Sequence, residues 1–180
     1  MTRLRVGATL RWTMLEDPSI HRPHNHPPRA SRVLAAGELI AVETEIWMGG
    51  AHTPHGEALL ETEIGNSWVI DCAGDIDVAY RTMPARWVSC VFPDIDGRPA
   101  AETLITSVVR EASEAIRRAG SSAPDRVYIM CQHGMNRSGL VSGLILRSLG
   151  LEPEDVIQRI RAARPGALAN DGFLRMLRQS

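Results

Sequence analysis

Residues 126–149 constrain the fold of this chain more than any other part of the sequence. Residues 127–130 form a short apolar run with β-branched and aromatic members, which is typical of a buried strand. From Arg137 to about Leu149, apolar residues recur at helical spacing. A strand ending at Cys131 is therefore joined to a helix by only five residues, so the connection must wrap tightly at the strand's carboxyl end.

The loop between Cys131 and Arg137 has the features of an anion site. A helix N-terminus presents unpaired N–H donors and the positive end of the helix dipole to such a loop. Arg137 adds a planar fork of donors that matches two phosphate oxygens at once. A cysteine in this positive field loses its proton easily, because the field stabilises the thiolate. A nucleophilic sulfur beneath a bound phosphate predicts covalent phosphoryl transfer.

The segment Cys131-Gln-His-Gly-Met-Asn-Arg137-Ser138 is specific, since chance would produce its four key residues only about 0.002 times in a chain of this composition. It resembles the Cys-x5-Arg-Ser/Thr signature of the cysteine-based protein tyrosine phosphatases. The short chain makes the compact dual-specificity branch the closer match. The resemblance extends over roughly residues 38–178. It implies a phosphatase catalytic domain over 38–180, preceded by a partly irregular N-terminal extension over 1–37.

The order of strand and helix candidates predicts the fold class. Strands are expected at 39–42 and 44–48 (a pair or one bent strand), 68–74, 86–92 and 127–130. Helices are expected after Pro99, from Arg137, after Pro153 and from Asn170. Strands interleaved with helices predict an α/β fold with a mostly parallel central sheet and helices covering its faces. The resemblance narrows this to a protein tyrosine phosphatase-like fold of the dual-specificity type.

Phosphate transfer also needs a proton for the leaving oxygen, and no residue of the loop supplies it. The turn-rich segment 93–99 contains Asp94 and Asp96. Both precede Cys131 by a distance that suits the acid loop of the family. The apolar-Pro-x-x-Asp pattern of the family is reproduced with Asp96. Asp96 is therefore predicted to be the general acid, Asp94 is the alternative, and a turn-capping role would explain either residue without catalysis.

The resemblance assigns further roles around the loop. Ser138 matches a hydroxyl that donates to the sulfur as it leaves, and Asn170 matches an Asn-x-x-Phe segment that supports the phosphate loop from behind. Capping of the last helix is an alternative role for Asn170, compatible with the first. One position departs from the family, which usually has His where this chain has Met130. The residues predicted to bind phosphate are Gln132, His133, Gly134, Met135, Asn136 and Arg137.

The resemblance implies a cysteine-dependent phosphatase that hydrolyses phosphomonoesters on proteins, with phosphotyrosine and also phosphoserine or phosphothreonine as candidates, through a phosphocysteine. Two alternatives remain. His133-Gly-Met-Asn-Arg-Ser-Gly139 is similar to the His-Gly-x-Asn-Arg-Thr-Gly of RNA 5′-triphosphatases in the same superfamily, although a net charge of −1 and a pI near 6.6 argue against an RNA track. The other alternative is a catalytically weak phosphate-binding module, yet the cysteine, arginine and acid that such proteins typically lose are all present.

Cys72, Cys90 and Cys131 fit a reducing compartment better than a disulfide scaffold. Cys72 lies near the end of an expected strand, where some members of the family place a second cysteine. That likeness implies a redox partner that traps oxidised Cys131 as a disulfide. The alternative is that Cys72 is simply a small buried apolar residue.

No cofactor or metal is predicted. Three histidines, His21, His24 and His26, lie in a proline-rich segment without a cysteine or acidic partner at metal-site spacing, so a solvated loop is expected there. No run approaches transmembrane length and the N-terminus has no signal-like apolar region, so no membrane partner and a cytoplasmic location are expected. The expected partner is a phosphorylated protein substrate; the oligomeric state is not predicted.

Overall fold

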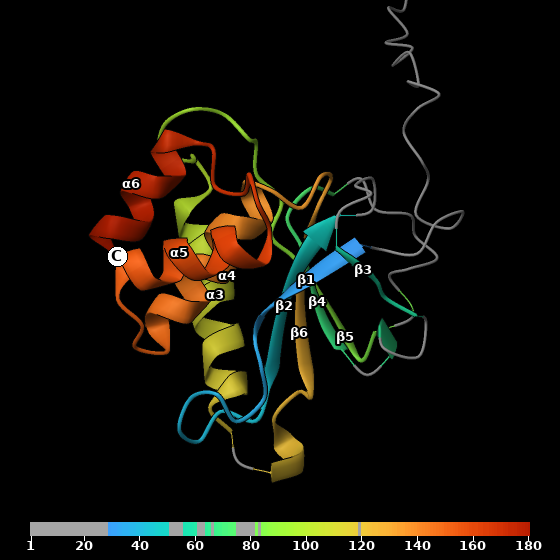
Figure 1. The fold of residues 1–180 in the computed structure, drawn as a ribbon. Coiled ribbons are helices and arrows are strands. Elements are labelled where there is room, and N and C mark those ends of the chain that lie inside the picture. Colours follow the sequence, from blue (N-terminus) through green and yellow to red (C-terminus); the bar gives the residue numbers. More distant parts are fainter. Residues whose placement is uncertain are drawn as a thin grey trace, which may run out of the picture.

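The computed structural model describes residues 29–50, 56–60, 64–65, 67–74, 82, 84–118 and 120–180 (Figure 1). The histidine-rich segment lies outside the described residues, as does all of the expected N-terminal extension before Arg29. None of the helices in the described ranges is long and apolar enough to cross a membrane.

A six-stranded sheet forms the centre of the fold, in the order β3-β1-β2-β6-β4-β5. The neighbouring strands β2, β6, β4 and β5 are all parallel, whereas β1 is antiparallel to both β2 and β3. The predicted α/β fold with a mostly parallel sheet is therefore confirmed. The strands are β1 (Arg29–Leu34), β2 (Glu45–Gly50), β3 (Glu57–Ala58), β4 (Ser67–Asp71), β5 (Arg86–Ser89) and β6 (Arg126–Cys131).

The helices α3 (Glu102–Ile116), α4 (Arg137–Ser148), α5 (Pro153–Ala163) and α6 (Asp171–Gln179) all lie on one face of the sheet (Figure 1). The sequence predicted helices on the faces of the sheet, and these four helices cover one of them. On the opposite face, a smaller apolar cluster of described residues includes Trp47, Tyr128 and Met130. Alternate residues of β6 face the two clusters, with Ile129 and Cys131 on the helical side. Burial on both faces explains why this strand is a continuous apolar run.

Two parts of the chain differ from the sequence-based expectation. Strand β1 lies inside the segment 1–37 that was expected to be an extension, and it pairs with β2 along its length. The strand expected at 39–42 is wrong, because these residues form a turn in which Ala41 has a φ of 62°. The turn is closed by a hydrogen bond from Gly37 N to Val42 O at 2.7 Å. Ile40 is fully exposed there, so its apolar side chain gains no burial from a strand.

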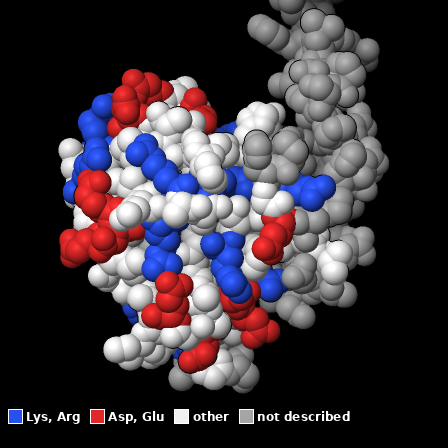
Figure 2. Space-filling model, in the orientation of Figure 1, with Lys and Arg blue, Asp and Glu red and all other residues white. Residues whose placement is uncertain are grey.

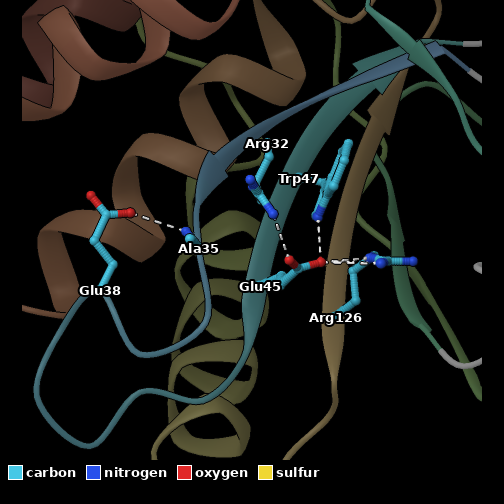
Figure 3. Close-up of polar contacts among 6 residues, drawn as sticks. All are labelled: Arg32, Ala35, Glu38, Glu45, Trp47 and Arg126. Atoms are coloured by element: carbon cyan, nitrogen blue, oxygen red, sulfur yellow. Dashed lines mark hydrogen bonds and ion pairs between the residues drawn. The ribbon is translucent and has the colours of Figure 1, made fainter.

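A polar cluster joins three strands at the end of the sheet opposite Cys131 (Figure 3). Glu45, the first residue of β2, accepts hydrogen bonds from Arg32 of β1 at 2.9 Å and from Arg126 of β6 at 3.0 Å. The indole of Trp47 donates to the same carboxylate at 2.9 Å. Burial raises the pKa of Glu45, but the hydrogen bonds from Trp47, Arg32 and Arg126 outweigh it and hold the pKa below its ordinary value.

Candidate active site

Cys131 is the last residue of β6 and only 3% exposed, and the loop 132–136 leads from it directly into α4. The backbone N–H of Gly134 donates a hydrogen bond to Cys131 Sγ at 3.1 Å. The thiol of Cys131 donates to Ser138 Oγ at 3.4 Å; once the thiol has lost its proton, the hydroxyl becomes the donor. The loop therefore covers the sulfur, and both the N–H of Gly134 and the hydroxyl of Ser138 can donate a hydrogen bond to a Cys131 thiolate.

Glycines at the end of β2 and within the loop allow the two backbones to approach this closely. In the parallel register of β2 and β6, Gly50 is opposite Cys131, so the two strands end together. A Cβ added to Gly50 would lie 2.5 Å from Gly134 N, and one added to Gly134 would lie 2.2 Å from the carbonyl carbon of Gly49. Gly134 also has a φ of 68°, a conformation that side chains disfavour. The loop thus rests directly on the end of β2.

Arg137 is the first residue of α4, where the helix N-terminus faces the loop. Its Nη1 donates to the backbone oxygen of Cys72 at 3.4 Å. Its Nε is buried and has no hydrogen-bond partner among the described residues. A buried guanidinium N–H without a protein partner is an expected feature of a site that binds an anion.

The remaining residues of the loop differ in exposure. Gln132, Met135 and Asn136 are half-buried, and His133 is exposed. The backbone oxygen of Met135 accepts a hydrogen bond from Leu168 N at 3.3 Å. The structure therefore brings the predicted phosphate-binding residues together around Cys131.

Asp94, Asn136 and Asn170 form a hydrogen-bonded clasp between the loop 93–99 (called the acid loop after the role predicted for it), the loop 132–136 (likewise called the phosphate loop) and the start of α6. Asn136 Nδ2 donates to Asp94 Oδ2 at 3.1 Å, and Asn170 Nδ2 donates to Asp94 Oδ1 at 3.1 Å. Asn136 Oδ1 in turn accepts from the backbone N–H of Asn170 at 3.3 Å. Asn170 Oδ1 caps α6 by accepting from Phe173 N at 3.2 Å. Asn170 thus contacts both the loop 132–136 and the first turn of α6.

Asp96 lies on the same loop but at the surface, with its side chain 80% exposed. Its carboxylate pairs with Arg175 of α6 at 3.6 Å, and within the described residues it forms no hydrogen bond or ion pair with the loop 132–136. The loop itself is close to α6, because a Cβ on Gly172 would lie 2.4 Å from Gly97 N. The two candidate acids thus differ: both oxygens of Asp94 are bound by amides, whereas Asp96 is held by one exposed ion pair.

Cys72 and Cys90 are both fully buried and free of disulfides. Cys72 follows β4, and its backbone N–H donates to Met130 O at 2.8 Å, which places it beside Cys131 across the β4–β6 pair. Burial raises the pKa of Cys72, and a hydrogen bond with Cys90 raises it further.

Arg164, which together with Pro165 fits the same family pattern as Asn170, also lies at the site, although the sequence predicted no role for its side chain. It follows α5 and is 1% exposed, and its Nη2 donates to the backbone oxygen of His133 at 3.3 Å. The burial of Arg164 could have been predicted from the sequence, because Arg164 follows the buried residues Val156 and Ile160 at the same helical spacing.

The fold is similar to those of solved phosphatases. Human DUSP28 superimposes with a TM-score of 0.57 at 17% identity, covering 85% of this chain and 93% of that chain. Tk-PTP in its active form gives a TM-score of 0.56 at 19% identity, covering 84% and 97%. Kinase associated phosphatase gives a TM-score of 0.61 at 13% identity, covering 85% and 93%. No protein-family model matches the sequence, and no curated protein sequence matches it.

The chain therefore has the fold of the cysteine-based protein tyrosine phosphatases. Within that class, its fold resembles the dual-specificity phosphatases.

Proposed function

We propose that this protein is a cysteine-dependent phosphatase that hydrolyses phosphomonoesters on proteins, phosphotyrosine among them. The proposal rests on the hydrogen-bond donors that lie around Cys131 Sγ. The N–H of Gly134 donates to the sulfur, while Arg137 keeps a buried donor without a described protein partner. A thiolate and an anion-binding fork on one loop are the two parts that covalent phosphoryl transfer requires.

The proposed reaction has two steps. The thiolate of Cys131 attacks phosphorus while the bond to the leaving oxygen breaks, and Asp96 gives that oxygen its proton. Water then attacks the phosphocysteine and gives a proton to Asp96, and the sulfur leaves as a thiolate that accepts a hydrogen bond from Ser138. Throughout, Arg137 and the loop N–H groups bind the equatorial oxygens. Asp96 must leave its ion pair with Arg175 to reach the substrate.

Asp96 is favoured over Asp94 because of what holds each carboxylate. Asp94 accepts from two amide side chains, and protonating it would break a contact that joins two loops. Asp96 can gain and lose a proton at the cost of only one exposed ion pair, which contributes little to stability.

The RNA 5′ end remains the second candidate substrate, because of the motif around Asn136. On the face seen in Figure 2, basic side chains are interspersed with acidic ones instead of forming a continuous basic track. This distribution favours a phosphorylated protein over RNA.

The test is hydrolysis of p-nitrophenyl phosphate, phosphotyrosine peptide, phosphothreonine peptide and 5′-triphosphate RNA by the full chain, each with and without chelator. We expect hydrolysis of the aryl phosphates and no effect of the chelator. Cys131→Ser should stop turnover while still binding inorganic phosphate. A Cys131→Ser variant that hydrolyses at the wild-type rate would refute the covalent mechanism, and phosphate binding without turnover by the wild type would identify a binding module.

A further inference from the structure

Arg164 is the largest fully buried side chain among the described residues. Removing a guanidinium from water is costly unless its surroundings accept its hydrogen bonds or balance its charge. The acceptors of Arg164 should therefore indicate what its burial achieves.

One of these acceptors belongs to the phosphate loop. Nη1 of Arg164 donates to Ser31 Oγ at 3.2 Å on β1, and Nη2 donates to His133 O at 3.3 Å. The oxygen of His133 and the N–H of Gly134 belong to the same peptide group. In a trans peptide these two groups point in opposite directions. Arg164 thus binds the outer side of the very peptide whose inner N–H donates to Cys131 Sγ at 3.1 Å.

The contact between Arg164 and His133 O also affects how well the site stabilises a negative charge on Cys131. A cation at the peptide oxygen polarises the amide and strengthens its N–H as a donor to a thiolate. Burial lowers the pKa of Arg164, whereas negative charge on Tyr128 or Cys131 raises it, so the guanidinium and a Cys131 thiolate stabilise each other. Burial also raises the pKa of Tyr128, which therefore stays neutral beside them.

Met130, the residue before Cys131, cannot stabilise the thiolate in this way. Met130 is 1% exposed on the opposite face of the sheet from Cys131, and its thioether has no hydrogen to donate. Among the described residues, the titratable or charged groups near Cys131 include Arg164, Arg137 of α4, Asp71 at the end of β4, Cys72 after it, and His133 of the loop itself. Arg164 is the cation among them that contacts the loop from its outer side.

We propose that Arg164 is a positioning residue for Cys131, which orients and polarises the His133–Gly134 peptide so that its N–H stabilises the thiolate. This inference rests on the proposed function for its catalytic consequence. Its effect on the sulfur, however, does not depend on turnover.

The test is the rate of Cys131 alkylation by iodoacetamide against pH, measured by peptide mapping in the wild type, Arg164→Met and Arg164→Gln. We expect the midpoint of the pH profile to move up by about one unit in Arg164→Met, with the acidic limb of kcat/KM moving with it. Arg164→Lys, which keeps the charge and a donor, should restore part of the shift. Arg159→Met is the matched control, because Arg159 lies on α5 one turn before Arg164 but contacts Val33 O and Glu38 instead of the loop.

Circular dichroism and thermal unfolding report whether each variant is folded. If Arg164→Met does not fold, Arg164→Gln decides, since it is neutral and still able to donate to His133 O or Ser31. A folded neutral variant whose alkylation midpoint equals that of the wild type, or an equal shift in Arg159→Met, would overturn the proposal. Absence of hydrolysis by the wild type would refute the proposed function alone, since the alkylation profile would still measure the role of Arg164.

Discussion

Asn136 of the phosphate loop donates a hydrogen bond to the carboxylate of Asp94 at 3.1 Å, across 42 residues of sequence. Asn170 binds the other oxygen of that carboxylate. Asp94 therefore fixes the acid loop against the phosphate loop, and this fixes the starting position of Asp96 two residues further along.

The first prediction separates these two aspartates. Asp96→Asn should lower kcat by about 10² to 10⁴ for phosphotyrosine peptide and much less for p-nitrophenyl phosphate, whose leaving group needs little protonation. Asp94→Asn should lower kcat for both substrates by a similar factor, because it disturbs the position of the loop. Steady-state rates with the two substrates check this. If the dependence on leaving group appears in Asp94→Asn instead, Asp94 is the acid.

The second prediction concerns the support beneath the loop. Gly50→Ala should lower kcat/KM by about 10²-fold, because the new methyl group would displace Gly134 and with it the donor to the sulfur. Gly139→Ala is the control: it lies on α4 near the site, but its methyl group would meet mainly the side chain of Leu168. Equal activities of the two variants would contradict the steric argument.

The third prediction is a redox response through Cys72. Peroxide should convert the Cys131 thiolate to a sulfenic acid, and the thiol of Cys72 should then attack that sulfur, forming a disulfide and releasing water. Peptide mapping after mild oxidation should find a Cys72–Cys131 peptide, and a thiol reductant should restore activity. Cys90→Ser is the control, since Cys90 contacts Cys72 but is one strand further from Cys131.

In Cys72→Ser the activity lost to peroxide should not return with reductant, because sulfenic acid is oxidised further. Full recovery by reductant in that variant would show that Cys72 does not protect the nucleophile.

The fourth prediction is a pH-dependent stability at the far end of the sheet. Because the folded state lowers the pKa of Glu45, its ionised form stabilises the fold above the ordinary value of about 4.5, and this contribution is lost as the pH falls through the folded-state pKa. Glu45→Gln should lower the free energy of unfolding by about 1–3 kcal/mol at pH 7. The difference from the wild type should shrink below about pH 4.5.

Urea unfolding at several pH values measures this difference. Glu38→Gln is the control, since Glu38 is more exposed and its ion pair with Arg159 should contribute less. A deficit in Glu45→Gln that is the same at pH 4 and pH 7 would contradict the assignment.

Local sequence was sufficient to predict the centre of the site. The apolar run of β6 and the helical spacing after Arg137 are separated by five residues, so strand, loop and helix had to be adjacent. The proposed anion site at Cys131 and Arg137 followed from that adjacency.

The parts that were not predicted depend on contacts between distant segments. Strand β1 has an irregular alternation with polar Ser31 and Arg32, and its pairing with β2 and β3 makes it a strand. The burial of Arg164 likewise depends on the position of the phosphate loop, because nothing in α5 itself would accept its hydrogen bonds. The clasp on Asp94 joins three segments that no local pattern relates.

The close approach of Gly134 to Gly49 and Gly50 also links the proposed reactivity of Cys131 to the assembly of the sheet. The loop can close over Cys131 only after β2 has paired with β6, a parallel pairing of segments that are far apart in the sequence and is therefore slow to form. Until then, Cys131 is an ordinary cysteine at the end of an unpaired segment. We therefore expect the reactivity proposed for Cys131 to arise together with the finished sheet.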